Sequence, residues 1–356
     1  PPRSTLFPYT TLFRSLVISN LGACALFAAM SGSSPATCAA IGKMGIPEMR
    51  KRGYPEGIAT GSIAAGGTLG ILIPPSSPVI VYGMATETSI GRLFLAGVVP
   101  GLMLVSLFMA WSIYATWAAG GRSSLARVSY TWRERIEIMP RVLPFVAIII
   151  GVLYAMYGGV ATPSETAAVG ALLCLIVAMI IYKLTSPSAL WCVLRDSTKE
   201  SVMILFIIGA AGVFSYMLSS LFITQSIAAW ISDLEVNRWV LMGAINVFLI
   251  VAGFFLPPVA VILMTAPILL PVIVTAGFDP IWFAVVLTIN MEIGLISPPV
   301  GLNLYVINGI APDISLKTIL KGSLPFVACM LIAIVLLCLF PGIATWLPNL
   351  VMGPAL

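Results

Sequence analysis

The chain consists of long apolar stretches that are interrupted by prolines, glycines and serines. Several stretches approach the ~20 residues that a helix needs to cross a bilayer. Backbone groups in lipid must be paired within their own segment, so these runs predict helices, whereas a membrane barrel would alternate over about ten residues. We expect spans at 57–83, 97–118, 142–157, 166–183, 200–221, 281–308 and 322–346.

Two further pairs of apolar arms have the pattern of hairpins, and the arms of the first pair are too short to span comfortably. The first pair covers 16–30 and 36–49 around the polar tip 31–35, and the second covers 238–255 and 260–275 around 256–259. We therefore predict two re-entrant helical hairpins, each followed by a span that contains a Pro-Pro pair.

Residues 47–75 and 271–299 are two copies of one segment, offset by 224 positions. Pro47 matches Pro271, Gly53 matches Gly277, and both copies end in a Pro-Pro pair. A duplicated, proline-broken apolar segment in the two halves of a membrane chain points to a transporter's binding site.

Composition supports a membrane protein, because the chain is 60% hydrophobic and 9% charged, against about 25% charged in soluble domains. If the hairpin base near Gly53 is cytoplasmic, the basic residues after position 15 all lie on the cytoplasmic side of the membrane, except Arg92 and Arg238. The base near Gly277 then faces outward, which predicts an inverted repeat. A parallel repeat or chance similarity is the alternative.

Several function classes are disfavoured. The chain has no histidine, which disfavours histidine-based catalysis and proton relays. None of its six cysteines forms a CxxC pair. It also lacks the phosphate-binding loop of ATPases, so ATP hydrolysis by that loop is disfavoured. The net charge of +5 is explained by topology, so no nucleic-acid partner is expected. A membrane enzyme would need a nucleophile with a base, or a metal cluster.

The first hairpin tip carries candidate ligands. Ser34-Pro35 is a typical helix start, with Ser34 as cap, and free N–H groups there favour an anion. Ser31, Ser33 and Ser34 add hydroxyl oxygens suited to a hard cation. The alternative is that serine and glycine only permit close helix packing.

The two broken spans repeat this logic. Pro74 and Pro75 release nearby carbonyls, and Ser77-Pro78 again predicts a cap and a helix start. In the second half, Ser297, Asn303 and the carbonyls of 294–299 are the matching candidates. Simple kinks are the alternative explanation.

Glu292 is a carboxylate within the second broken span, and Thr68 occupies the duplicate position. It could hold a cation, carry a proton or pair with a positive residue on another helix or subunit. By contrast, Thr162 and Glu165 in Thr-Pro-Ser-Glu predict a structural capping box.

Domain organisation follows from these elements. We expect a foreign tail at 1–15, a first repeat with hairpin at 16–118, a cytoplasmic amphipathic loop at 119–141, connecting helices at 142–221 and a second repeat at 222–356. The 224-residue offset predicts that the first repeat lacks helices, so we expect an N-terminally truncated chain.

Four segments carry a family resemblance: SGSSPATCAAIGKMGIPEMRKRGYPEGIATG, GILIPPSSPVIVYG, ATPSETAAVGA and GLISPPVGLNLYVI. In this order they resemble the large membrane subunit of tripartite ATP-independent periplasmic (TRAP) transporters over about residues 16–346. The resemblance implies an all-α polytopic inner-membrane protein of elevator type.

The resemblance also implies a function and its partners. It implies sodium as coupling ion and no other cofactor, a periplasmic binding protein that delivers an organic acid such as a dicarboxylate or sugar acid, and a small four-helix membrane subunit. A self-sufficient carboxylate symporter is the nearest alternative, and a purely structural membrane partner has no need of broken helices.

In that family the sodium regions match tip 31–35 with break 70–77, and tip 253–259 with break 294–303. The candidate sodium ligands, mainly through backbone carbonyls, are Ser31, Gly32, Ser33, Gly70, Pro74, Leu256, Gly294, Ser297 and Pro299. The candidate substrate residues are Ser33, Ser34, Thr68, Ser76, Ser77, Ser297 and Asn303.

Overall fold

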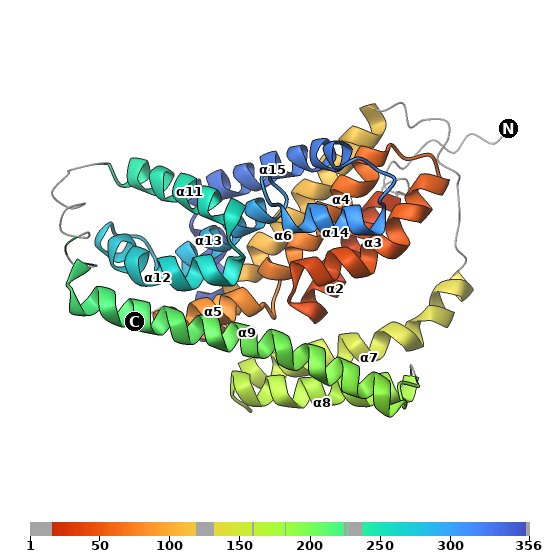
Figure 1. Ribbon diagram of the computed structural model, residues 1–356, viewed down its shortest axis with the longest axis horizontal. Coiled ribbons are helices and arrows are strands. Elements are labelled where there is room, and N and C mark those ends of the chain that lie inside the picture. Colours follow the sequence, from red (N-terminus) through yellow and green to blue (C-terminus); the bar gives the residue numbers. More distant parts are fainter. Residues whose placement is uncertain are drawn as a thin grey trace. The chain divides into compact units, whose positions relative to one another are not determined.

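The computed structural model describes residues 16–118, 132–158, 160–181, 183–223, 226 and 237–353. Within these ranges every regular element is a helix (Figure 1), as expected for an all-α membrane protein. The chain divides into two compact units. The first holds the described residues up to 118 and from 222 onward, and the second holds those from 132 to 221.

Seven segments in the described ranges are long and apolar enough to cross a membrane. They are Glu56–Thr86, Ile90–Ala118, Pro163–Ile181, Pro187–Leu218, Arg238–Phe255, Pro258–Thr275 and Leu316–Leu339. The helical, polytopic architecture predicted from the apolar pattern is therefore confirmed.

The first half of unit one is a helical hairpin followed by a broken helix. Its hairpin consists of α2 (Leu16–Ser31) and α3 (Ser34–Lys51), which are joined by Gly32 at a φ of +56°. The broken helix consists of α4 (Glu56–Leu72) and α5 (Ser77–Thr86), and α6 (Ile90–Ala118) follows. Helix α4 ends before Pro74 and Pro75 because neither proline can donate to the helical ladder.

The second half repeats this order of elements. Its hairpin is α11 (Arg238–Phe255) with α12 (Pro258–Thr275), and its broken helix is α13 (Pro280–Leu295) with α14 (Leu302–Ile310). Helices α15 (Leu316–Leu339) and α16 (Gly342–Met352) follow. Helix α12 has the bounds of α3 shifted by the same 224 positions. The Pro-Pro peptide bonds of both breaks are cis.

The two halves exchange contacts reciprocally. Helix α14 packs against α3 of the first hairpin, and its counterpart α5 packs against α12 of the second hairpin (Figure 1). Similarly, α4 packs on α15 while α13 packs on α6. Each of these two contacts has its counterpart when the copies are exchanged, as a two-fold relation would produce.

The core of unit one is formed by α4 and α13. Every residue from 59 to 72 and from 281 to 295 is buried. Helix α4 is rich in glycine, alanine and serine, and Gly61 lies so close to Gly322 of α15 that an added Cβ would overlap its backbone. Small residues allow this approach in the absence of a hydrophobic driving force between helices in lipid.

Unit two contains α7 (Trp132–Tyr157), α8 (Pro163–Ile181) and α9 (Pro187–Ser220). The predicted capping box at the start of α8 is confirmed. The Glu165 carboxylate accepts hydrogen bonds from the backbone N–H of Thr162 at 2.8 Å and from its hydroxyl at 2.9 Å.

Three predicted boundaries are wrong. The last span does not continue to 346, because α15 ends at Leu339 and Pro341 precedes the separate α16. Helix α9 begins at Pro187 rather than near 200, since proline is well suited to the first turn. Residues 132–141 belong to α7 instead of a loop, whereas 119–131 and the predicted foreign tail lie outside the described residues.

Candidate functional site: two hairpin tips and two helix breaks

The first hairpin tip lies directly on the first helix break. A Cβ added at Gly32 would lie 2.8 Å from the carbonyl oxygen of Pro75 and 3.6 Å from the hydroxyl of Ser77. A Cβ added at Gly70 of α4 would lie 2.9 Å from the carbonyl oxygen of Ser33. Only glycine permits both approaches, so tip 31–35 and break 70–77 are brought together as predicted.

Small oxygen atoms gather at this contact. The Ser31 hydroxyl is 2.9 Å from the Thr37 hydroxyl, and the Thr37 hydroxyl donates to the Ser33 carbonyl at 2.8 Å. Thr37 was missed by the sequence analysis. It lies one turn into α3 from Ser33, and this i, i+4 spacing was the available signal.

The predicted caps are shifted by one residue. Helix α3 is capped at Ser33 rather than Ser34, and α5 is capped at Ser76 rather than Ser77. Neither serine side chain makes a cap hydrogen bond. In both cases the serine before proline already has helical geometry, and the extended residue before it serves as the boundary.

Asn303 joins the second broken helix to the first hairpin. Its amide nitrogen donates to the Ser34 hydroxyl at 2.8 Å and to the Ala64 carbonyl at 3.1 Å, and its amide oxygen lies 3.1 Å from the same hydroxyl. Both side chains are buried. The resemblance had matched Asn303 with the second tip, whereas the structure places its side chain against Ser34, α3 and α4.

The remaining candidates of the first half differ in accessibility. The hydroxyl of buried Thr68 donates to the Ala65 carbonyl at 2.7 Å. The hydroxyl of buried Ser76 donates to the Ile71 carbonyl. Ser77 is exposed, whereas Pro74 is buried. The hydroxyl of Thr68 is thus engaged within α4, and the hydroxyl of Ser76 is engaged by the end of α4 across the break. Ser77 is exposed beside the tip.

The second tip and break meet at a glycine pair. A Cβ added at Gly294 of α13 would overlap the backbone of Gly253 in α11. Ser297 is 5% exposed within the break, and Leu256 and Pro299 are both exposed.

Two polar groups inside α13 are not satisfied by the described part of the chain. The Asn290 amide donates to Asn246 of α11 at 2.6 Å, but its oxygen has no partner. Glu292 is 0% exposed and neither carboxylate oxygen has a hydrogen-bond partner.

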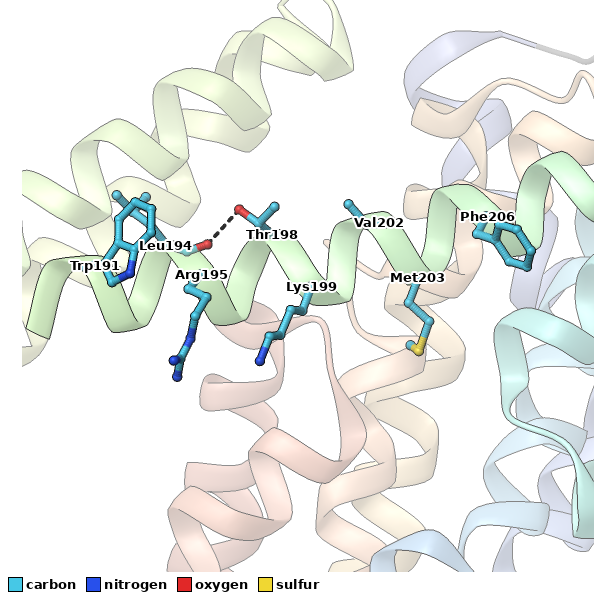
Figure 2. Close-up of a pocket in the computed structure, with 8 residues that line it drawn as sticks. All are labelled: Trp191, Leu194, Arg195, Thr198, Lys199, Val202, Met203 and Phe206. Carbon is cyan, nitrogen blue, oxygen red and sulfur yellow. Dashed lines mark hydrogen bonds between the residues drawn. The ribbon is translucent and has the colours of Figure 1, made fainter.

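A groove of about 590 Å³ lies elsewhere. All eight residues that line it come from α9 in unit two, and Figure 2 shows Arg195, Lys199 and Met203 pointing away from the same side of that single helix. It holds none of the predicted site residues.

The first tip and break offer hydroxyl and carbonyl oxygens without a fixed positive side chain, which is the ligand type of hard cations.

Comparisons with known proteins agree with this architecture. The chain matches the family described as "Tripartite ATP-independent periplasmic transporter, DctM component" over residues 12–343. It is 40% identical over 334 residues to the C4-dicarboxylate TRAP transporter large permease protein DctM of Pseudomonas aeruginosa, covering 94% of this chain and 77% of the relative.

Other relatives carry different substrate names. The Vibrio cholerae sialic acid TRAP transporter large permease SiaM is 31% identical, over 94% of this chain and 77% of the relative. The YdaH transporter of Alcanivorax borkumensis shares the fold with a TM-score of 0.67 at 14% identity, over 92% of this chain and 81% of that one.

The family match covers both hairpins and both breaks, and the relatives are transporter permeases rather than enzymes. With its apolar helices, the chain is a multi-pass inner-membrane protein. It belongs to the DctM family, the large permease components of TRAP transporters.

Proposed function

We propose that this chain is the membrane subunit of a sodium-coupled secondary transporter that imports an organic acid of the C4-dicarboxylate type. The observation that carries the proposal is the seating of the first hairpin tip on the first helix break, where Gly32 meets Pro75 and Gly70 meets Ser33. Discontinuous helices of this kind bind ions with freed carbonyls and anions with helix N-termini.

The coupling ion is sodium because the tip supplies only neutral oxygen ligands. The hydroxyls of Ser31 and Thr37 and the Ser33 carbonyl are joined by hydrogen bonds, and an ion there would accept these three oxygens as ligands in place of those bonds. The acid binds beside it, where the N-termini of α3 and α5 and the Ser77 hydroxyl meet.

The substrate class comes from the relatives. Those named for C4-dicarboxylates are 40% and 36% identical to this chain, whereas the sialic acid and ectoine permeases are 31% and 32% identical. A sugar acid is therefore the second choice.

We infer the partners from the family: a periplasmic binding protein that delivers the acid, and a small membrane subunit. A relative from Oleidesulfovibrio alaskensis, named as the isethionate permease DctMQ, is longer, since the matched region is 51% of it. The reciprocal packing of α3 with α14 and of α12 with α5 supports an inverted repeat, in which the hairpins move together in an elevator motion.

The test is uptake of labelled C4-dicarboxylate by proteoliposomes that contain the complete transporter. We expect uptake with a sodium gradient and binding protein, and none when choline replaces sodium. Uptake without sodium would overturn the coupling, and undiminished uptake without binding protein would favour a self-sufficient symporter. Sialic acid, isethionate and ectoine in parallel decide the substrate class.

The sites have their own test in the same assay. Ser33→Trp and Ser297→Trp should abolish uptake while the protein still inserts, because a bulky side chain fills the tip or the break. Gly309→Trp is the control, since it has open space around its Cβ position. Normal sodium-dependent uptake by both serine variants would remove these regions from the site.

A further inference from the structure

A groove of about 300 Å³ lies in unit one, where the start of α4 meets the last turns of α6 and the start of α15. These three helices pack against one another. Gly57 of α4 and Gly322 of α15 line the groove, and the nearest neighbour of a Cβ added at Gly57 would be the Gly322 backbone at 3.6 Å. Glycine therefore leaves this space unfilled. Most of the remaining lining is apolar and includes Ile58, Trp111, Ala115, Pro325 and Phe326.

One polar side chain of the lining is uncommitted, and it is positively charged. The Ser112 hydroxyl donates to the Phe108 carbonyl at 2.7 Å, and the Thr318 hydroxyl is 2.9 Å from that of Ser315. Lys321 is exposed at the rim and forms no ion pair among the described residues. The groove therefore combines an apolar interior with a single ammonium group at its edge.

The charges around the rim favour an anion. Lys317 lies one turn before Lys321 on the same face of α15, is exposed and likewise has no ion pair in the described part of the chain. The acidic residues nearest in sequence to the groove, Glu56 and Asp313, both pair with Arg50, at 3.3 and 2.6 Å. The two lysines therefore present positive charge that no carboxylate of the described residues neutralises.

The groove lies at the level of a membrane–water interface. The last two turns of α6 carry Trp111, Tyr114 and Trp117, with successive ring centroids 5.5 and 6.5 Å apart. Tryptophan and tyrosine gather at headgroup level, and lysines near helix ends extend toward it. Phe326 lies about 7.5 Å beyond Lys321 along α15, toward the apolar middle of the helix. The groove therefore runs from headgroup level into the acyl-chain region.

We propose that this groove binds one anionic phospholipid of the cytoplasmic leaflet, with the phosphate at Lys321 and an acyl chain against Trp111 and Phe326. The predicted topology places Lys317 and Lys321 on the cytoplasmic side, and anionic lipids give that leaflet a negative surface potential. The volume of the groove is at the lower end of the range for small-ligand pockets. It suits a lipid chain, whereas a helix of another subunit is about 10 Å wide.

The test measures quenching of Trp111 by brominated lipid in the purified complete transporter, reconstituted in phosphatidylcholine. Bromine on an acyl chain quenches only tryptophans that the chain contacts, and subtracting the signal of Trp111→Phe isolates Trp111 from the other tryptophans. We expect brominated phosphatidylglycerol to reach half-maximal quenching at about one fifth of the share that brominated phosphatidylcholine needs. A fivefold preference corresponds to the ~1 kcal/mol that one lysine contributes near an anionic surface.

Two pairs of variants locate the two ends of the lipid. Lys321→Gln should lower the preference for phosphatidylglycerol from about fivefold to near one, whereas Lys43→Gln, at an exposed lysine of α3 outside the groove, should retain it. Ala115→Phe should reduce quenching of Trp111 by both lipids, because the added ring fills the groove. Ala110→Phe should leave quenching unchanged, since Ala110 is exposed and lies about 140° around α6 from Ala115. Lys321→Gln alters only an exposed side chain, so it decides the proposal even where the larger phenylalanine disturbs packing.

Equal quenching by the two lipids in the wild type would mean ordinary contact with bulk lipid and would overturn the site. A preference that survives Lys321→Gln would overturn it as well. No quenching of Trp111 by either lipid would mean that another protein segment or subunit fills the groove, with the same consequence. These measurements need neither a sodium gradient nor an organic acid, so their outcome is independent of the proposed transport function.

Discussion

At the scale of single residues, Gly32 shows how one missing side chain positions the first tip. Gly32 and Gly53 both have positive φ, +56° and +75°, which costs a non-glycine residue about 1–2 kcal/mol. A Cβ would meet Pro75 at Gly32 but nothing within 4 Å at Gly53. A substitution at Gly53 therefore tests backbone strain alone, whereas the same substitution at Gly32 tests strain together with contact with the break.

We predict that Gly32→Ala abolishes sodium-dependent uptake, because the tip must move away from the break to accommodate the methyl group. Gly53→Ala should lower the unfolding temperature modestly and retain uptake. Uptake in proteoliposomes and thermal unfolding in detergent measure both effects. Equal loss of uptake in the two variants would mean that the tip contact has no special role.

Asn303 is the second decisive residue, since it makes hydrogen bonds to both Ser34 and Ala64. Asn303→Leu leaves these buried groups without a partner and should destabilise the protein by about 1–3 kcal/mol. Asn308→Leu is the matched control on the same helix, because Asn308 is half-buried and has no hydrogen bond among those described.

A double-mutant cycle with Ser34→Ala measures the coupling. The two substitutions should be non-additive in the free energy of unfolding, since each removes the same interaction. Additive effects would show that the halves are held together by other contacts.

At the scale of elements, proline and glycine made most of the fold predictable. The Pro-Pro pairs marked both breaks, and the polar tip 31–35 marked the first hairpin, because these residues change what the backbone can do locally. The caps at Ser33 and Ser76 were displaced by one residue, since the sequence pattern does not fix where an extended residue becomes helical.

The site was predictable only in part for a different reason. Ser33 and Gly70 could be paired through the family resemblance, but the contact between Asn303 and Ser34 joins residues 269 positions apart. No local pattern encodes which tip a broken helix will reach. The same limit applies to Glu292, whose lack of a partner depends on eight packed helices.

The loop between α14 and α15 is tied to the first hairpin by an ion pair. Arg50 at the end of α3 lies 2.6 Å from Asp313 and also contacts Glu56. The hydrogen bond from the Arg50 guanidinium lowers the pKa of Asp313 below its ordinary value. The folded protein therefore binds this proton less tightly than the unfolded chain does.

The sign of the pH effect follows from that lowered pKa. The pair contributes stability above the ordinary aspartate pKa of about 3.9, and the contribution is lost as pH falls through the lowered value. We predict a small loss of thermal stability for Asp313→Asn at neutral pH that disappears in acid. Glu200→Gln, at an exposed carboxylate of α9 that forms no ion pair within the described residues, should show no such pH-dependent difference, and a constant difference for Asp313→Asn would contradict the ion pair's role.

At the scale of the whole molecule, the reciprocal contacts constrain how the two halves are related. Helix α3 packs on α14 as α12 packs on α5, which is the contact pattern that a two-fold operation between the halves would produce. If its axis lies in the membrane plane, the two hairpins enter from opposite sides, and both tips approach the midplane. Such an arrangement would support the proposed single site that is alternately open to each side.

The charges around the hairpin bases provide the orientation. Lys43, Arg50, Lys51 and Arg52 lie on the hairpin arm that leads to the base at Gly53. The base at Gly277 has Asp279 and a single arginine, Arg238, whose guanidinium lies 5.8 Å from the ring of Phe278. Basic residues are retained on the cytoplasmic side during insertion. We predict that a reporter active only in the cytoplasm gives a strong signal when fused after Gly53 and none after Gly277, with a periplasm-only reporter giving the reverse.

Equal cytoplasmic signals at the two bases would make the repeats parallel. The hairpins would then enter from one side, and their tips could not line one midplane pocket from opposite directions. Replacing Lys51 and Arg52 with glutamine should weaken the orientation of the first fusion but leave the second unchanged, because only the first base depends on basic residues. A shift at both bases would mean that the chain is oriented as one unit by charges elsewhere.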